Sequence, residues 1–126
     1  MDSETEIIAG KILYAIKNGA KRFREIERVT NLSSTTITKY THDLEEEGLL
    51  ILKSDKDRRK IIYQLNEAKM DEINKLIEAY LKSEEEQLEK SFLTLAKSDP
   101  EKARNVIKRL QSFLEKEIFE DEDSGK

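Results

Sequence analysis

Four polar side chains between Thr35 and His42 have types and spacing suited to hydrogen bonding with another molecule. On an expected helix they lie away from its apolar face, and they are Thr35, Thr38, Lys39 and His42. Small hydroxyl groups bond either kind of base and Lys donates to guanine, so this set suits the reading of duplex DNA. The alternative for each residue is an ordinary solvated position on an exposed helix.

Basic residues flank this helix on both sides in the sequence. An expected loop at 54–59 and the residue after it contribute Lys56, Arg58, Arg59 and Lys60. An earlier helix is preceded or opened by Lys21, Arg22 and Arg24, which could contact the phosphates of a duplex. Hairpin loops are charged in most proteins, so the charge of this loop alone does not indicate a function. Its functional interpretation depends on the helix beside it.

Apolar periodicity indicates how these side chains are positioned. Spacings of three and four predict helices with apolar faces at Ile8, Ile12, Ala15 and Ile16, at Phe23, Ile26 and Val29, and at Ile37, Tyr40, Thr41 and Leu44. Ser33 or Ser34 can cap the third helix, and Gly48 stops it. Branched apolar runs at 49–53 and 60–65 predict a β-hairpin around the charged loop. This order of elements outlines a winged helix-turn-helix.

The chain after Asn66 has a helical pattern throughout. One helix is expected to end near Lys97, and a second to begin with a Ser98 to Glu101 capping box around Pro100. The second helix carries a heptad-like apolar seam, which we predict to be a dimerisation surface: Val106, Ile107, Leu110, Phe113, Leu114 and Ile118. Two long helices joined by so short a turn should pair antiparallel and leave apolar surface for a second copy. The alternative is that this hairpin folds back on its own N-terminal domain.

The predicted fold class is therefore mainly α with a small β-hairpin. We expect a DNA-binding winged helix-turn-helix at 1–66, a helical dimerisation extension at 67–120 and a disordered acidic tail at 121–126. The 126 residues include no Cys and one His, which excludes disulfides and thiolate metal sites, and no cofactor is expected.

The chain shows no signal-peptide pattern and no apolar run long enough to cross a membrane, so we expect a cytoplasmic protein with no membrane partner. It has no Gly-rich phosphate loop, no nucleophile with a plausible His partner and no metal-ligand spacing. Its carboxylates cluster as solvated helix surfaces do. We therefore expect a protein that is not an enzyme.

The net charge of −4 is unevenly distributed along the chain. Residues 11–65 carry 12 basic and 8 acidic side chains, a balance of +4, whereas residues 66–126 carry 11 and 16, a balance of −5. A basic module joined to an acidic extension fits a protein that turns one face to phosphates. The alternative is two solvated surfaces of chance polarity.

These segments resemble the winged-helix transcriptional regulators of the MarR, HxlR and ArsR kind. The segment "AKRFREIERVTNLSSTTITKYTHDLEEEGLL" is similar to their helix-turn-recognition-helix region, and "SDKDRRKIIYQLNEA" resembles a MarR-type wing, with Asn66 in place of the usual Thr. The resemblance implies that the recognition helix enters the major groove, and that the residues nearest the bases are Ser34, Thr35, Thr38, Lys39 and His42. It also implies a minor-groove contact by Arg59 in the wing.

Together these features predict a sequence-specific, homodimeric regulator of transcription that binds double-stranded DNA. The effector ligand, if the protein has one, is not indicated by any motif. The alternative is a winged-helix adaptor that binds other proteins in transcription or DNA partition machinery, because a fold does not dictate a function.

Overall fold

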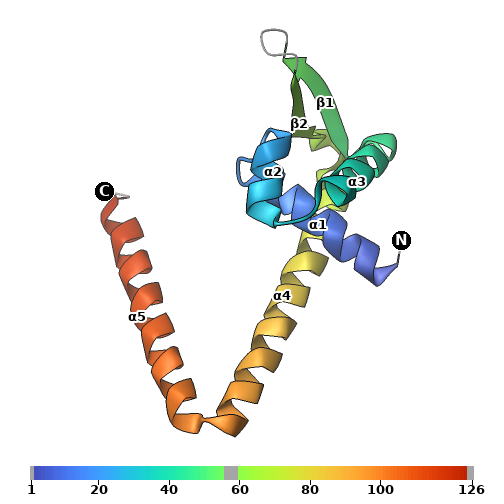
Figure 1. The fold of residues 1–126 in the computed structure, drawn as a ribbon. Helices are drawn as coiled ribbons and strands as arrows, with labels where there is room; N and C mark the ends of the chain where they lie inside the picture. The colour runs from blue at the N-terminus through green and yellow to red at the C-terminus, as the bar shows by residue number, and fades with distance from the viewer. Residues whose placement is uncertain (1, 56–59, 125–126) are drawn as a thin grey trace. The chain divides into compact units, whose positions relative to one another are not determined.

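The computed structural model describes residues 2–55 and 60–124. Its elements, shown in Figure 1, are α1 (Ser3–Lys17), α2 (Phe23–Thr30), α3 (Ser34–Glu46), β1 (Leu50–Asp55), β2 (Lys60–Leu65), the short 3-10 helix η1 (Glu67–Lys69), α4 (Met70–Ser98) and α5 (Pro100–Ser124). They form two compact units, Met1–Glu84 and Glu85–Lys126. The predicted fold class, three helices and a β-hairpin followed by two C-terminal helices, is confirmed.

Local side-chain chemistry sets the ends of the first three helices. Asp2 accepts a hydrogen bond of 2.8 Å from the Thr5 amide, which lets α1 begin at Ser3, earlier than its apolar pattern. Ser33 caps α3 as predicted. After α3 the chain turns at Gly48, whose backbone is left-handed with φ of 82°. This is the glycine that the sequence indicated as the stop of this helix.

The core of the first unit lies among α1, α2, α3, the hairpin and the start of α4. Its largest buried side chains are Ile12, Leu13, Ile26, Ile37, Leu44, Leu49, Leu50 and Ile73. One predicted core position is wrong: Val29 is 59% exposed, whereas Thr30 is buried. Ile26 and Thr30 are four residues apart, about one helical turn, so they lie on the same inward face of α2. The buried Thr30 hydroxyl is satisfied by donating to the Ile26 carbonyl at 2.6 Å.

Strands β1 and β2 pair antiparallel, with Leu50 opposite Leu65 and Asp55 opposite Lys60. The first strand therefore continues two residues beyond the predicted end at Lys53, because pairing with β2 extends into the segment that we expected to be loop. At the base of the hairpin the Tyr63 amide donates to the Lys21 carbonyl at 2.8 Å. This bond ties the hairpin to the start of α2.

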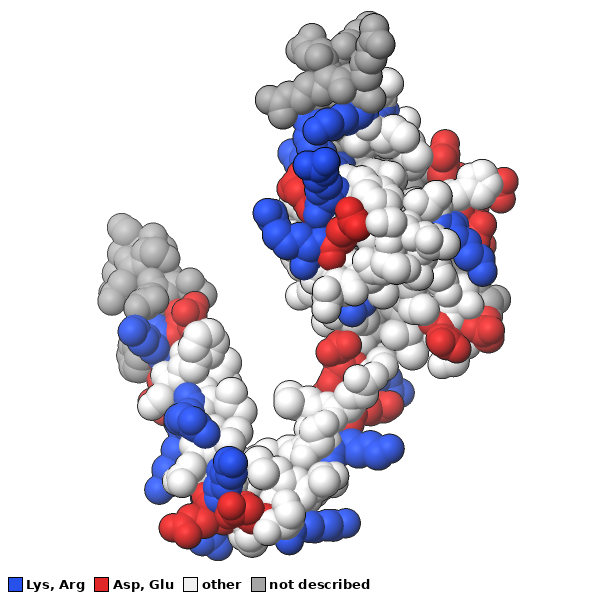
Figure 2. Space-filling model, viewed as in Figure 1, with Lys and Arg blue, Asp and Glu red and all other residues white. Residues whose placement is uncertain are grey.

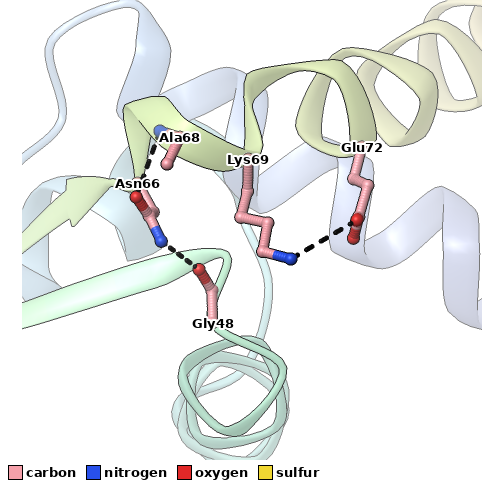
Figure 3. Close-up of polar contacts among 5 residues, drawn as sticks. All are labelled: Gly48, Asn66, Ala68, Lys69 and Glu72. Atoms are coloured by element: carbon pink, nitrogen blue, oxygen red, sulfur yellow. Dashed lines mark hydrogen bonds and ion pairs between the residues drawn. The ribbon is translucent and has the colours of Figure 1, made fainter.

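The connection from β2 to α4 is held by Asn66, shown in Figure 3. Its side-chain oxygen accepts from the Ala68 amide at 3.2 Å, and its side-chain nitrogen donates to the Gly48 carbonyl at 2.7 Å. Lys69 and Glu72 form an ion pair of 3.8 Å one turn later. Asn66 thus caps the following helical turn and also binds the backbone of Gly48, which lies between α3 and β1.

We expect Asn66→Ala to reduce the free energy of unfolding by about 1–3 kcal/mol, because the substitution leaves the Gly48 carbonyl and the Ala68 amide without their partner. Chemical denaturation of the whole chain measures this difference. The control is Gln64→Ala, an exposed position in the preceding strand β2, for which we expect a change within about 0.5 kcal/mol. Equal stability of the two variants would show that the Asn66 contacts contribute nothing.

Helix α4 begins as part of the first unit. Ile73 and Ile77 are buried in its core, and the backbone of α4 comes so close to α1 that a Cβ at Gly10 would lie 2.0 Å from the Leu76 carbonyl oxygen. A glycine is needed for this approach. The compact unit therefore extends to Glu84, beyond the boundary that we placed at Asn66.

In the second unit Asp99 alone separates α4 from α5. The predicted Ser98 capping box is wrong, because α4 includes Ser98, whose hydroxyl donates to the Thr94 carbonyl at 3.2 Å. Asp99 is the residue whose carboxylate accepts from the Lys102 amide, at 3.1 Å. Pro100 opens α5, as predicted.

Helix α5 continues to Ser124, so residues 121–124 are helical where we expected a disordered tail. No Gly or Pro interrupts the sequence between Pro100 and Gly125, and Glu favours helix. The two long helices do not cover each other's apolar faces, because Leu88, Leu93, Leu110, Phe113 and Leu114 all remain exposed.

Candidate nucleic-acid interface

The exposed face of α3 carries all five side chains that the sequence proposed as base readers, Ser34, Thr35, Thr38, Lys39 and His42. The opposite face buries Ile37, Thr41 and Leu44 in the core, and this packing directs the five outward. The structure therefore presents hydroxyl, amine and imidazole groups together on one solvated surface.

Three of these five side chains already have partners within the protein. The Ser34 hydroxyl donates to the Glu27 carboxylate of α2 at 2.8 Å. The Thr38 hydroxyl donates to the Ser34 carbonyl, also at 2.8 Å. His42 Nε2 lies 3.2 Å from a carboxylate oxygen of Glu46, one turn further along the helix.

Thr35 and Lys39 have fewer contacts within the protein. Within the described part of the chain, the Thr35 hydroxyl has no hydrogen-bond partner. The Lys39 ammonium lies 5.9 Å from the centre of the Tyr40 ring, near the limit of a cation–π contact. Both side chains are available to an external ligand.

A groove of 420 Å³ between α2 and β2 lies next to this face. Its lining combines cations, one acid and apolar side chains: Arg22, Phe23, Arg24, Glu27, Lys60, Ile61 and Tyr63. Figure 2 shows Lys and Arg side chains gathered over α2 and the end of the hairpin next to its loop, with some acidic side chains among them. Since Glu27 both lines the groove and binds Ser34, the groove and the α3 face are contiguous.

The predicted phosphate contacts are only partly brought together. Arg22, Arg24 and Lys60 share this groove, whereas Lys21 lines a separate groove of 660 Å³ on the other side of Tyr63. Burial raises the pKa of the Tyr63 hydroxyl above its ordinary value of 10.0, so this phenol keeps its proton at neutral pH. The wing residues Lys56, Arg58 and Arg59 lie outside the described residues.

Sequence reasoning missed Glu27. An acid seven residues before Ser34 has no helical relation to it, because the turn between α2 and α3 separates them. The sequence therefore offers no signal for this contact.

The described residues contain neither a cluster of metal-ligating side chains nor a helix long and apolar enough to cross a membrane.

Comparison with known proteins finds a match within the first unit. Residues 11–68 match the family model described as a winged helix DNA-binding domain. This segment is similar to that family. The predicted resemblance to a winged helix is confirmed for this segment, which contains α2, α3 and the β1–β2 hairpin. No curated protein matches the sequence significantly.

Solved structures of MarR-family regulators share the fold over most of the chain. BpsR of Bordetella bronchiseptica is 19% identical, with a TM-score of 0.59 over 86% of this chain and 73% of its own. ZitR of Lactococcus lactis, described as a zinc-responsive MarR family member, is 17% identical, with a TM-score of 0.56 over 89% and 74%. A MarR family regulator from Silicibacter pomeroyi is 14% identical, with a TM-score of 0.55 over 86% and 69%.

Proposed function

We propose that this protein is a transcriptional regulator that binds double-stranded DNA sequence-specifically as a homodimer. The observation that carries the proposal is the continuity of the polar α3 face with the groove lined by Arg22, Arg24 and Lys60. A recognition helix needs side chains that reach base edges and neighbouring cations that hold the phosphates. The structural relative BpsR is described as a protein whose DNA binding is regulated by 6-hydroxynicotinic acid, which agrees with this assignment.

The two parts of the surface have different roles in this proposal. Thr35 and Lys39 read base edges in the major groove, where Lys donates to guanine O6 and N7. Arg24 and Lys60 hold phosphates and carry no sequence information. The wing residues Lys56, Arg58 and Arg59 reach toward the minor groove, with Arg59 as the main contact, by resemblance to other winged helices.

Dimerisation is proposed from the second unit. Leu110, Phe113 and Leu114 on α5 are 50%, 60% and 57% exposed, and Ile107 is also exposed. Contiguous apolar surface of this kind marks an interaction site. A second copy of α5 covers it with the same residues, as a two-fold interface requires, and Val106 extends the seam at one end. The predicted seam residue Ile118 lies outside the residues whose side chains are described.

Two substitutions separate the proposed roles. Lys39→Ala should reduce discrimination between a selected duplex and bulk DNA, because a lost base contact costs about 1–3 kcal/mol. Arg24→Ala should weaken both by a similar factor, since phosphate contacts are common to all sequences. The duplexes are first selected from a random pool by the unaltered protein, and affinities are measured by fluorescence anisotropy. If neither variant alters binding, the assigned surface is wrong.

A further inference from the structure

The hydroxyl group of Ser34 is already committed as a donor. A hydroxyl carries one proton and two acceptor lone pairs, whereas a carboxylate can only accept. The 2.8 Å contact between Ser34 Oγ and Glu27 Oε2 therefore consumes the single proton of Ser34. Toward solvent, Ser34 presents lone pairs only.

We propose that Glu27 is a positioning residue that makes Ser34 an obligate acceptor, so that the base pair facing Ser34 is recognised through an exocyclic amino group. In the major groove such donors are adenine N6 and cytosine N4, whereas guanine and thymine offer acceptors at the corresponding positions. This inference rests on the proposed function. A serine hydroxyl ordinarily pairs with a donor or an acceptor on a base, whereas Ser34 pairs only with an amino group.

The position of Ser34 favours a base contact. It is the first residue of α3, and the N-terminal residues of a recognition helix are those that approach base edges. Ser33, not Ser34, caps the helix, so the Ser34 side chain has no capping role to lose. A hydrogen bond to a carboxylate is also stronger than one between neutral groups. The Ser34 hydroxyl therefore keeps its proton and directs its O–H at Glu27.

The other two hydroxyls on this face are not constrained in the same way. Thr38 donates to a neutral backbone carbonyl, which is a weaker attachment. Thr35 has no partner within the described residues and is free to donate or accept. Amino-group selectivity is therefore expected at the Ser34 base pair and not at the Thr35 base pair.

The charge of Glu27 also affects the total affinity for DNA, and the experiment must separate this effect from the effect on base preference. Glu27 lines the groove with Arg22, Arg24 and Lys60, so removal of its charge also raises affinity for any duplex. Total affinity is therefore not informative. The informative quantity is the ratio of affinities for two duplexes that differ at one base pair.

The test uses the full chain and duplexes selected from a random pool. Ser34→Ala first identifies the base pair whose preference depends on Ser34. The unaltered protein is then titrated with the selected duplex and with one in which that base lacks its amino group, purine for adenine or 2-pyrimidinone for cytosine. We expect affinity to fall by roughly 5- to 150-fold without the amino group.

A third duplex carries guanine in place of the contacted adenine, or thymine in place of the contacted cytosine, each with its complement, so that a carbonyl oxygen replaces the amino group. Glu27→Leu should bring the ratio of affinities for the selected and this third duplex close to one, because the freed hydroxyl can then donate to the carbonyl, while ratios at the other base pairs stay unchanged. Glu27→Gln, whose amide both donates and accepts, should give an intermediate ratio. Thr35→Val is the matched control and should affect a different base pair only. The modified-base duplexes test the inference with the unaltered protein, so it does not depend on the folding of any variant.

The inference is wrong if the amino group is dispensable, if Glu27→Leu keeps the full ratio, or if Ser34→Ala changes no base preference. In each of those cases the unaltered protein still binds and selects duplexes, so the proposed function stands. Failure of the proposed function has a different signature, which is the absence of duplex binding by the unaltered protein at low salt.

Discussion

Leu110→Glu should dissociate the proposed homodimer and lower affinity for a two-half-site duplex by about 100- to 10,000-fold, the factor that linked binding sites typically provide. In a single copy Leu110 is 50% exposed, so a Glu side chain there remains solvated and the protomer stays folded. In a dimer the same charge is buried without a partner, which is strongly unfavourable. The cost therefore falls on the interface alone.

The matched control is Gln111→Glu, which adds the same charge at the next residue of α5, also exposed but outside the proposed seam. It should remain dimeric and bind normally. Light scattering gives the oligomeric state and gel shift gives the affinity on the same samples. A Leu110→Glu protein that stays dimeric and binds DNA would place the dimer interface on another surface.

Affinity for duplex DNA should also fall by roughly 1,000-fold between about 50 mM and 200 mM salt. Arg22, Arg24 and Lys60 are the proposed phosphate contacts, which makes about six in a dimer, and each such contact releases a counterion on binding. The logarithm of affinity is then expected to fall with the logarithm of salt concentration with a slope of about −5. Titrations at four or more salt concentrations give this slope directly.

Arg24→Ala should make that slope less steep by about 2, one contact per protomer. Lys116→Ala, an exposed lysine on α5, removes the same charge far along the sequence from the groove and should leave the slope unchanged. Equal slopes in the two variants would remove Arg24 from the phosphate-binding surface. A slope near zero for the unaltered protein would argue against duplex binding altogether.

Local features of this fold were predictable because their causes are local. Ser33 caps α3 and Gly48 provides the left-handed backbone after it, and both act through bonds or torsions within a few residues. The inward face of α3 follows from a helical repeat of 3.6 residues, which a sequence displays directly. The outward face with Thr35, Thr38, Lys39 and His42 is its complement, so the candidate readers could be named without coordinates.

Features that depend on a distant partner were missed or misplaced. Val29 and Thr30 are neighbours, and which of them is buried depends on how α2 packs against the other helices. The two additional residues of β1 are strand because β2 pairs with them. The cap at Asp99 was misplaced for a local reason: α4 extends one residue further, through Ser98, before the chain turns.

The order of elements, the polar side chains of α3 and the apolar seam of α5 can be read from the amino-acid sequence, because each is a repeating pattern or a local signal along one stretch of chain. The grouping of Arg22, Arg24 and Lys60 in one groove, with Lys21 in another, comes from the packing of α2 and β2. The bond between Glu27 and Ser34 likewise forms across a turn between two helices. Hydrogen bonds and charge effects depend on distance in space, and packing between elements sets that distance.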